Sequence, residues 1–379
     1  MSSRQATLII AAPEADSNLY YACRFLAPDP IIYFETGDKK HLVLSDLEID
    51  RAREQADVDK ILSLADTLKG LRKQKKSSAP IYTRIVDLIF KAKKIREIVV
   101  PANFPAQYFQ ALKGFGYRMT VKADPFFEAR LIKSPEEKKL IRHALKQVET
   151  ALGETVHFLQ TCKIRGKYVY HGREKITSEF LQNQINSRLM ELGCVANHTI
   201  VASGPQGSLP HHEGSGPILA HTPIIFDIFP RDSRSRYFAD MTRTMVKGKA
   251  SAEVKKMYQA VLEANTRGRE MASAGVTGKA VHLAATVCME KRGFKTGKMN
   301  GCMQGFIHST GHGLGLDIHE LPSVSLAGGK LKTGNVITIE PGLYYRKHGG
   351  IRIEDVVYVT KNGSEALTKF PRVLEVDRL

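Results

Sequence analysis

The sequence predicts an α/β domain over residues 1–130, followed by an α+β domain with antiparallel strands over residues 131–379. Three observations predict this organisation. The chain has 379 residues, more than a single domain usually contains. Strand and helix patterns alternate in its first third, which is typical of an α/β layer. After residue 131, helices separate groups of strands joined by short polar loops, which favours antiparallel pairing.

The elements of the first domain are predicted from runs of β-branched and aromatic residues and from amphipathic stretches. We expect strands at residues 7–13, 30–36, 41–46, 97–103 and 117–124, and helices at residues 45–55 and 79–94.

The second domain is expected to follow the segment ADPFFEARLIKSPEE, residues 123–137. Ser134 as N-cap, Pro135 in the first turn and Glu137 closing a capping box predict a helix start. Apolar residues at helical spacing continue this helix through residues 136–160. Further helices are expected at 177–192, 251–273 and 278–292, and strands at 197–204, 222–229, 237–246, 335–345 and 351–360.

Composition indicates an ordinary folded protein of a reducing compartment. The hydrophobic fraction is 42% and the charged fraction 25%. Five cysteines form no CxxC pair and are odd in number, so we expect no disulfide framework and a cytoplasmic location. The first apolar run is too short for a signal peptide, and no stretch of about 18 apolar residues predicts a membrane span.

The formal net charge is +17, from 56 lysine and arginine residues against 39 acidic ones. Such an excess steers anions or nucleic acid toward a surface. The densest basic clusters, residues 69–76 and 91–96, lie in helical-looking stretches, and we interpret them as solvated helix faces. Nucleic-acid binding is therefore the less favoured interpretation of the charge.

Four carboxylates and one imidazole are the most informative residues of the chain: Asp227, Asp240, His312, Glu340 and Glu354. Each lies in or beside a predicted strand or a glycine-rich turn. Oxygen and nitrogen donors without a thiolate suit two divalent ions such as Mn²⁺, Co²⁺ or Zn²⁺. Two metals held by carboxylates can polarise a scissile carbonyl and activate water. If the five residues converge, the protein is a metallohydrolase.

The two aspartates lie in neighbouring predicted strands. Asp227 interrupts the apolar run TPIIFDIF, where an unpaired charge is costly to bury. A solvent-facing aspartate at a strand edge is the simpler interpretation of this residue alone. Thirteen residues later, Asp240 and Thr242 share a strand face. Two carboxylates brought side by side repel and need a cation between them.

The stretch GFIHSTGHGLGLDIHELP concentrates three histidines, His308, His312 and His319. A single histidine is more often structural than catalytic. Glycines at 311, 313 and 315 make a regular helix improbable and allow close backbone approach. We expect one of these histidines to bind metal and the others to donate hydrogen bonds to a substrate.

Glu340 and Glu354 interrupt β-branched strands fourteen residues apart, as in a broad hairpin. Arg352 shares a face with Glu354 and is expected to orient a carboxylate. Two other motifs are absent from the sequence. VASGPQGS lacks a full GxSxG elbow, and GHGLG does not match the GxGxxG of dinucleotide-binding proteins.

These motifs resemble those of the pita-bread metallopeptidases, a family that includes aminopeptidase P, prolidase, methionine aminopeptidase and the metal-free creatinase. The family's metal ligands match Asp227, Asp240 in DMTR, His312 in TGHGLGLDIHE, Glu340 in IEPG and Glu354 in IRIED. The resemblance covers the whole second domain. The segments DSNLYYACRFLAPDP and LVLSDLEIDRA resemble the creatinase-type N-terminal domain, which methionine aminopeptidase lacks.

The resemblance also suggests positions for the substrate-binding histidines. The family's PH motif falls on His211, with the adjacent His212 as a competing residue, and His308 and His319 match further active-site histidines. The segment DIFPRDSRSRYFAD lacks the family's glycine and is about two residues longer, which makes Asp232 a competitor of Asp227. We prefer Asp227 because it is embedded in a strand.

The resemblance implies an Xaa-Pro aminopeptidase or prolidase with two divalent ions, manganese first and cobalt or zinc next. Glu340 would act as general base and acid, while His211 and His319 would stabilise the tetrahedral intermediate. Phe306 and His308 are expected to form part of a proline pocket, and His211 and Arg352 to help bind substrate. A homodimer acting on short peptides with proline second is expected, without membrane or nucleic acid.

Two alternatives belong to other classes. A catalytically inactive pita-bread protein could bind nucleic acid or protein through its basic surface, but such proteins usually lose metal ligands. Creatinase-like amidine hydrolysis is disfavoured because that metal-free site lacks the full ligand set. Metal analysis of the purified protein distinguishes the peptidase from both.

Overall fold

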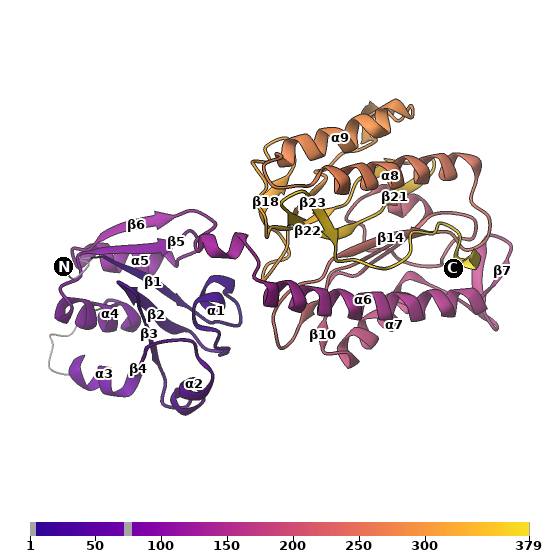
Figure 1. The fold of residues 1–379 in the computed structure, drawn as a ribbon. Coiled ribbons are helices and arrows are strands. Elements are labelled where there is room, and N and C mark those ends of the chain that lie inside the picture. The colour runs from indigo at the N-terminus through magenta and orange to yellow at the C-terminus, as the bar shows by residue number, and fades with distance from the viewer. Residues whose placement is uncertain (1–4, 72–77, 379) are drawn as a thin grey trace. The chain divides into compact units, whose positions relative to one another are not determined.

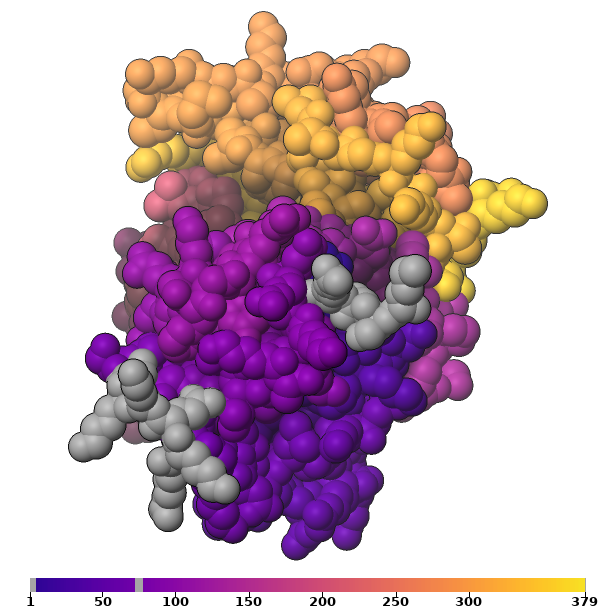
Figure 2. All heavy atoms as spheres, turned by 90° about the vertical axis from the view of Figure 1, so that its left-hand side faces the viewer, coloured from indigo at the N-terminus to yellow at the C-terminus, as the bar shows by residue number. Residues whose placement is uncertain are grey.

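The computed structural model describes residues 5–71 and 78–378 (Figure 1 and Figure 2). The chain divides into two compact units, residues 1–130 and 131–379. Of the two basic clusters expected to form solvated helix faces, residues 72–76 of the first lie outside the described part. The second cluster begins in the last turn of a helix and continues, largely exposed, into the turn that follows.

The first unit contains a six-stranded mixed sheet with the order β4-β3-β2-β1-β5-β6. Its strands are β1 (Gln5–Ala11), β2 (Ile31–Thr36), β3 (Lys39–Leu44), β4 (Lys60–Ser63), β5 (Glu97–Pro101) and β6 (Arg118–Lys122). The order β3-β2-β1 is antiparallel, and β4, β5 and β6 join it in parallel. The predicted α/β layer is confirmed.

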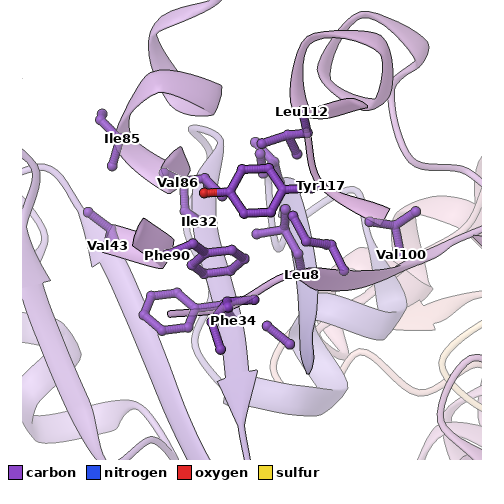
Figure 3. Packing of buried hydrophobic residues seen from close by; sticks show 14 of the residues in the cluster. Leu8, Ile32, Phe34, Val43, Ile85, Val86, Phe90, Val100, Leu112 and Tyr117 are labelled. Carbon is purple, nitrogen blue, oxygen red and sulfur yellow. The ribbon is translucent and has the colours of Figure 1, made fainter. Parts of the chain in front are cut away.

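Helices cover both faces of this sheet, because successive residues of its strands point to opposite sides. Leu8 and Phe34 pack with Phe90 and Tyr117 in one core, shown in Figure 3. Ile9 belongs to the core on the other face. The helices are α1 (Ser17–Cys23), α2 (Ile49–Gln55), α3 (Leu64–Leu71), α4 (Ile81–Ala92) and α5 (Ala106–Gly114). The sequence patterns missed α1, α3, α5 and β4, which are short elements of nine residues or fewer.

The four predicted helices of the second unit are confirmed to within two residues: α6 (Pro135–Thr161), α7 (Ser178–Glu191), α8 (Ala252–Met271) and α9 (Gly278–Lys291). The capping box of α6 forms as expected, with Ser134 Oγ accepting from Glu137 N at 3.1 Å and Glu137 Oε2 accepting from Ser134 N at 2.8 Å. In Figure 1, α8 and α9 lie on one side of the strands, and α6 and α7 on the other.

The strands of the second unit form several small antiparallel sheets, which confirms the predicted α+β class. The two that position polar side chains are β11-β12-β14 and β18-β17-β19-β22-β23. Their strands are β11 (Ile200–Ser203), β12 (Ile224–Ile228), β14 (Met241–Met245), β17 (Gly311–Gly313), β18 (Glu320–Val324), β19 (Val336–Ile339), β22 (Asp355–Thr360) and β23 (Gly363–Ala366). A hairpin of β20 (Gly342–Tyr345) and β21 (Gly349–Arg352) lies between β19 and β22 in sequence.

Two predicted strands are each divided in the structure. The run 335–345 separates into β19 and β20 around Glu340 and Pro341, and the run 351–360 separates into β21 and β22 around Glu354. Both glutamates therefore lie where one strand ends and another begins, which frees their backbone from a continuous ladder. Among the described residues, no helix is long and apolar enough to cross a membrane.

Candidate metal centre

Strands β12 and β14 place the two aspartates at one end of a sheet. Asp227 lies in β12 and pairs with Thr242 of β14, while Asp240 precedes β14 by one residue. The competing Asp232 lies between them in sequence, at the end of the short strand β13 (Arg231–Asp232), and its Oδ1 accepts from Arg234 N at 3.1 Å and Ser235 N at 2.7 Å in the turn that follows. Asp227 lines the cleft described below, and Asp232 is not among its lining residues.

His312 comes from β17, which lies unusually close to its neighbours. A Cβ atom on Gly311 would lie 2.0 Å from Thr338 O, and one on Gly313 would lie 2.3 Å from Leu321 O. These glycines therefore allow the strand that carries His312 to enter the sheet. The GHG pattern is explained by this close backbone approach.

The orientation of the His312 ring suits metal binding. Nδ1 lies 3.1 Å from Gly313 O, so this nitrogen carries the proton and donates it to the carbonyl. Nε2 is then left with a lone pair, and it lies 3.6 Å from Asp240 Oδ2 and 3.4 Å from Glu340 Oε1. Burial lowers the pKa of His312, which also favours the neutral, ligating form.

Glu340 and Glu354 meet just beyond the β19–β22 ladder. The last pair of that ladder joins Ile339 to Asp355, so the next residue of β19 and the preceding residue of β22 lie opposite each other. This confirms the broad hairpin expected from their spacing. Glu340 N donates to Thr310 O at 2.7 Å, which ties its strand to the histidine-rich segment.

All five predicted ligands line one cleft with a volume of about 590 Å³. Ligand atoms of Asp240, His312 and Glu354 lie within 4.8 Å of one another. Asp227 and Glu340 line the same cleft beside them. The structure thus brings together residues that span more than 120 positions of the sequence.

The carboxylates of this cluster are held in an environment that disfavours their charged forms. Burial, followed by the charges of Glu354 and Asp227, raises the pKa of Asp240. Burial and the charges of Glu340 and Asp227 raise the pKa of Glu354. Burial raises the pKa of Glu340 to about 7. Such buried groups of like charge need a cation among them to remain ionised together at neutral pH.

Two unsatisfied atoms show that a metal fits this donor set. Asp227 Oδ1 and Glu354 Oε1 are buried side-chain oxygens without a hydrogen-bond partner. Buried polar atoms are normally paired, and an ion is one explanation for those that are not. Carboxylate oxygens and one imidazole nitrogen are the donors expected for Mn²⁺, Co²⁺ or Zn²⁺.

A second group of residues fixes the other oxygens of the cluster. Arg352 Nη2 donates to Asp227 Oδ2 at 2.6 Å, as expected for a residue that orients a carboxylate. Thr242 Oγ1 donates to Glu354 Oε2 at 2.8 Å. Tyr344 was not predicted, yet its hydroxyl accepts from Arg352 Nη1 at 2.7 Å and lies 2.9 Å from His308 Nε2. Its position in the conspicuous run EPGLYY was the available sequence signal.

Behind the cluster, a buried arginine joins the two strands that carry Asp240 and Glu354. Arg243 Nη1 donates to Thr242 O at 2.8 Å and Glu354 O at 2.6 Å, and its Nη2 donates to Asp355 Oδ1 at 2.9 Å. Although burial opposes it, the charges of Arg243 and Arg372 hold the pKa of Asp355 below its usual range. This network fixes the backbone from which Glu354 projects.

The histidines expected to contact substrate differ in whether they line the cleft and whether the protein already hydrogen-bonds their rings. His211 lines the cleft, whereas His212 accepts from Gly214 N through Nδ1 at 2.9 Å and is not among the lining residues. His319 lines the cleft with its ring edge-on to His312, the centroids 4.3 Å apart. No protein partner within the described residues hydrogen-bonds the ring of His319, so it is available to a substrate.

His308 lines the cleft, but both of its ring nitrogens are engaged by the protein. Nδ1 lies 2.7 Å from Ser309 O and must donate to it, so Nε2 accepts from the Tyr344 hydroxyl. Burial lowers the pKa of His308 to about 3, which keeps the ring neutral. Phe306 is buried against His308, centroids 5.3 Å apart, and is not among the cleft's lining residues. His308 thus shapes the cleft, with Phe306 packed behind it, and neither residue has a hydrogen bond to donate to a substrate.

The raised pKa values predict how chelation changes the pH dependence of stability. A carboxyl whose folded pKa exceeds its unfolded value stabilises the protein at low pH, and that stability is lost as pH rises through the folded pKa. For Glu340, whose pKa is raised from 4.5 to about 7, this stability is lost as the pH rises from 4.5 to about 7. We expect the melting temperature of chelated protein to fall from pH 5 to pH 7.5, and that of protein with excess Mn²⁺ to fall less. Parallel curves with and without metal would contradict this.

The sequence was compared with families and proteins of known type. The model of the family described as metallopeptidase family M24 matches residues 139–361. An Xaa-Pro dipeptidase of Pyrococcus horikoshii is 31% identical over 349 residues, which cover 89% of this chain and 86% of its relative.

Solved structures resemble the fold over nearly its whole length. An X-Pro aminopeptidase from Thermotoga maritima aligns with a TM-score of 0.80 and 26% identity, covering 98% of this chain and 97% of the other. A prolidase from Pyrococcus horikoshii aligns with a TM-score of 0.78 and 28% identity, covering 98% and 95% of the two chains. Both the residues 1–130 and the cleft-bearing unit therefore have counterparts in these structures.

Proposed function

This chain belongs to metallopeptidase family M24, and we propose that it is an exopeptidase that hydrolyses the bond between an N-terminal residue and a following proline. The observation that carries the proposal is the convergence of Asp227, Asp240, His312, Glu340 and Glu354 in one cleft, with two buried oxygens left unpaired. Metal analysis combined with an Xaa-Pro hydrolysis assay tests it directly.

The five residues would hold two divalent ions, with Asp240 and Glu354 as the candidates to bridge them. When bound, such ions polarise the scissile carbonyl and lower the pKa of water, so that a nucleophile is available near neutral pH. Arg352 and Thr242 keep Asp227 and Glu354 oriented through the hydrogen bonds described above.

We propose that Glu340 moves protons during the reaction. As general base and acid, it would accept a proton from the attacking water and return that proton to the proline nitrogen that leaves. His319 and His211, which line the cleft, would donate N–H groups to the carbonyl oxygen as charge develops on it. His308 and Tyr344 hold Arg352 and the cleft wall in place.

We further infer the metal ion, the cellular compartment, the domain roles and the oligomeric state of this peptidase. Manganese is the preferred ion over cobalt or zinc, since four of the five candidate donors are carboxylates, which suit Mn²⁺. All five cysteines are free, which supports a reducing cytoplasm. Residues 1–130 act as a creatinase-like domain and residues 131–379 as the catalytic domain, in a homodimer that limits substrate length. The two compact units and the full-length structural matches support the division into these two domains.

The alternative of an inactive protein that only binds nucleic acid or protein is not favoured. An inactive relative would be expected to lose ligands, whereas this chain keeps all five and brings them into one cleft. Creatinase-like chemistry is disfavoured for the same reason.

The proposed specificity predicts a difference between proline and alanine at the second position. Proline's amide lacks an N–H, and an apolar wall is needed to receive its ring. Ile200, Pro210, Phe229 and Ile318 supply apolar lining. We expect kcat/KM for Ala-Pro-Ala to exceed that for Ala-Ala-Ala by about 10–200-fold, the range for small changes in apolar fit. Equal cleavage of the two peptides would contradict the proposed preference for proline but not the proposed metal centre. The dipeptide Ala-Pro, assayed beside them, shows whether dipeptides or longer peptides are preferred.

A further inference from the structure

A small three-stranded sheet follows the end of α6, well separated in sequence from the cleft residues. It consists of β7 (Lys163–Arg165), β8 (Tyr168–His171) and β9 (Glu174–Lys175), and Figure 1 shows β7 near the C-terminal end of α6. The sequence of this sheet is KIRGKYVYHGREK, residues 163–175, and Glu174 is its only acidic residue. The segment was not one of the basic clusters selected from the sequence.

The strand register places rings and cations on one face. Tyr170 lies opposite Lys163 on one side and Lys175 on the other, and Tyr168 lies opposite Arg165. Directly opposed residues, and residues two apart in a strand, point to the same side of a sheet. One face of the sheet, here called the tyrosine–lysine face, therefore carries two tyrosines between three cations.

This face is directed outward. Lys163, Arg165 and Lys175 are exposed, and Tyr168 and Tyr170 are half-buried. The alternate residues, Ile164 and Val169, are half-buried and buried respectively, as expected for the inner face. Two exposed cations in the hairpin turns, Lys167 and Arg173, extend the positive surface at its margins.

The positive charges of this surface are not neutralised by the protein. Within the described chain, these five lysines and arginines form no ion pair with a carboxylate. Three of them instead approach tyrosine rings: Lys175 Nζ and Lys167 Nζ lie 4.5 and 5.2 Å from the centroid of Tyr168, and Arg165 Cζ lies 5.4 Å from that of Tyr170. Other exposed lysines do have an acidic partner, as Lys139 has in Glu136. An anionic ligand would supply the missing counter-charges.

We propose that the tyrosine–lysine face binds single-stranded nucleic acid, in addition to the peptidase function of the cleft. Tyrosine rings offer a stacking surface to any base, and flanking cations contact the backbone phosphates. The lysine ammonium groups lie on flexible stems, so they move from a ring to a phosphate when a base takes their place. The arrangement alternates rings with charges, as this ligand requires.

Other anionic partners fit this face less well. An anionic membrane would need apolar side chains that insert, but Ile164 and Val169 belong to the opposite face. An acidic peptide would pair with the cations, but its carboxylate side chains would not stack on the rings of Tyr168 and Tyr170. Both are included below as competing outcomes.

The test measures binding of the full-length protein to fluorescein-labelled oligo(dT) and oligo(U) of twelve nucleotides by fluorescence anisotropy. We expect both to bind at 50 mM salt, and a plot of the logarithm of the binding constant against the logarithm of the salt concentration should have a slope of about −2 if three phosphates are contacted.

Replacing Tyr168 and Tyr170 together by alanine should weaken binding at least about tenfold, and replacing both by phenylalanine should not, because stacking is retained. Lys163→Gln with Lys175→Gln should reduce the slope by about 1.4.

Lys146→Gln with Lys291→Gln is the matched control, since it removes two exposed lysines of α6 and α9 that also form no ion pair within the described residues, and it should leave binding unchanged. The proposal is overturned if the control weakens binding as much as Lys163→Gln with Lys175→Gln, if polyglutamate or phosphatidylserine vesicles bind as tightly as the oligonucleotides, or if no binding occurs at 50 mM salt. If the alanine pair does not fold, the phenylalanine and glutamine pairs decide the outcome. Xaa-Pro hydrolysis should be unchanged in every variant, so the two proposals fail or hold separately.

Discussion

Replacing Asp240 by asparagine, or Glu354 by glutamine, is expected to remove most bound divalent metal and to lower kcat/KM at least about 10³-fold, since metal polarisation supplies several kcal/mol. Each side chain is a candidate bridge between two ions, so one substitution disturbs both. Purified wild-type protein should contain close to two ions per chain by elemental analysis. Full activity after exhaustive chelation, with no metal detected, would contradict the hydrolase model.

The matched control for this experiment is Asp232→Asn. Asp232 lies between Asp227 and Asp240 in sequence but accepts hydrogen bonds from its own turn and does not line the cleft. Its substitution should leave metal content and activity near wild-type values. Loss of metal in this variant, with retention in an Asp227→Asn variant, would show that the competing aspartate is the ligand.

A metal-free measurement separates ligand loss from misfolding. In chelated protein, Asp240→Asn and Glu354→Gln should raise the melting temperature at pH 7.5, because each wild-type carboxyl must either bind a proton or stay charged among like charges, whereas the amide does neither. A misfolded variant would melt at a lower temperature. Added Mn²⁺ should stabilise the wild-type protein more than either variant.

His319→Ala and His312→Ala are expected to give different losses. His319 lines the cleft without a protein partner, so its loss should lower kcat by about 10²–10³-fold, the effect of deleting one donor to the transition state, while metal content stays unchanged. His312 directs a lone pair toward Asp240 and Glu340, so its loss should lower metal content. Elemental analysis and single-turnover rates on the two proteins distinguish the effects.

His212→Ala serves as the control for the histidine variants, because His212 adjoins His211 but does not line the cleft. It should retain both metal and activity. An exchange of the two phenotypes, with metal lost from the His319 variant and kept in the His312 variant, would show that the histidine roles are assigned wrongly.

Much of the fold followed from local sequence. The capping box at Ser134 and Glu137 and the apolar spacing after it were sufficient to place the 27-residue helix α6 nearly to the residue. Short elements such as α1 and β4 were missed, because a seven-residue helix and a four-residue strand contain too few periods for a pattern to emerge. The continuous strands expected through Glu340 and Glu354 were also wrong. Pro341 and Gly342 are a local signal for the first break, whereas the β-branched residues around Glu354 give no such signal for the second.

The sequence by itself singled out the candidate donors, since isolated carboxylates within apolar strands are costly unless a cation or partner offsets them. Only the tertiary structure decided which side chains line the cleft and which ones already hydrogen-bond to the protein. It separated Asp227 from Asp232 and His211 from His212, and it engaged both nitrogens of His308 through Ser309 and Tyr344. The reason is that a hydrogen-bond partner is set by chain segments far apart in sequence, as when Arg352 reaches Asp227 across 125 positions. The same holds for the tyrosine–lysine face, whose alternation of rings and cations exists only in the strand register.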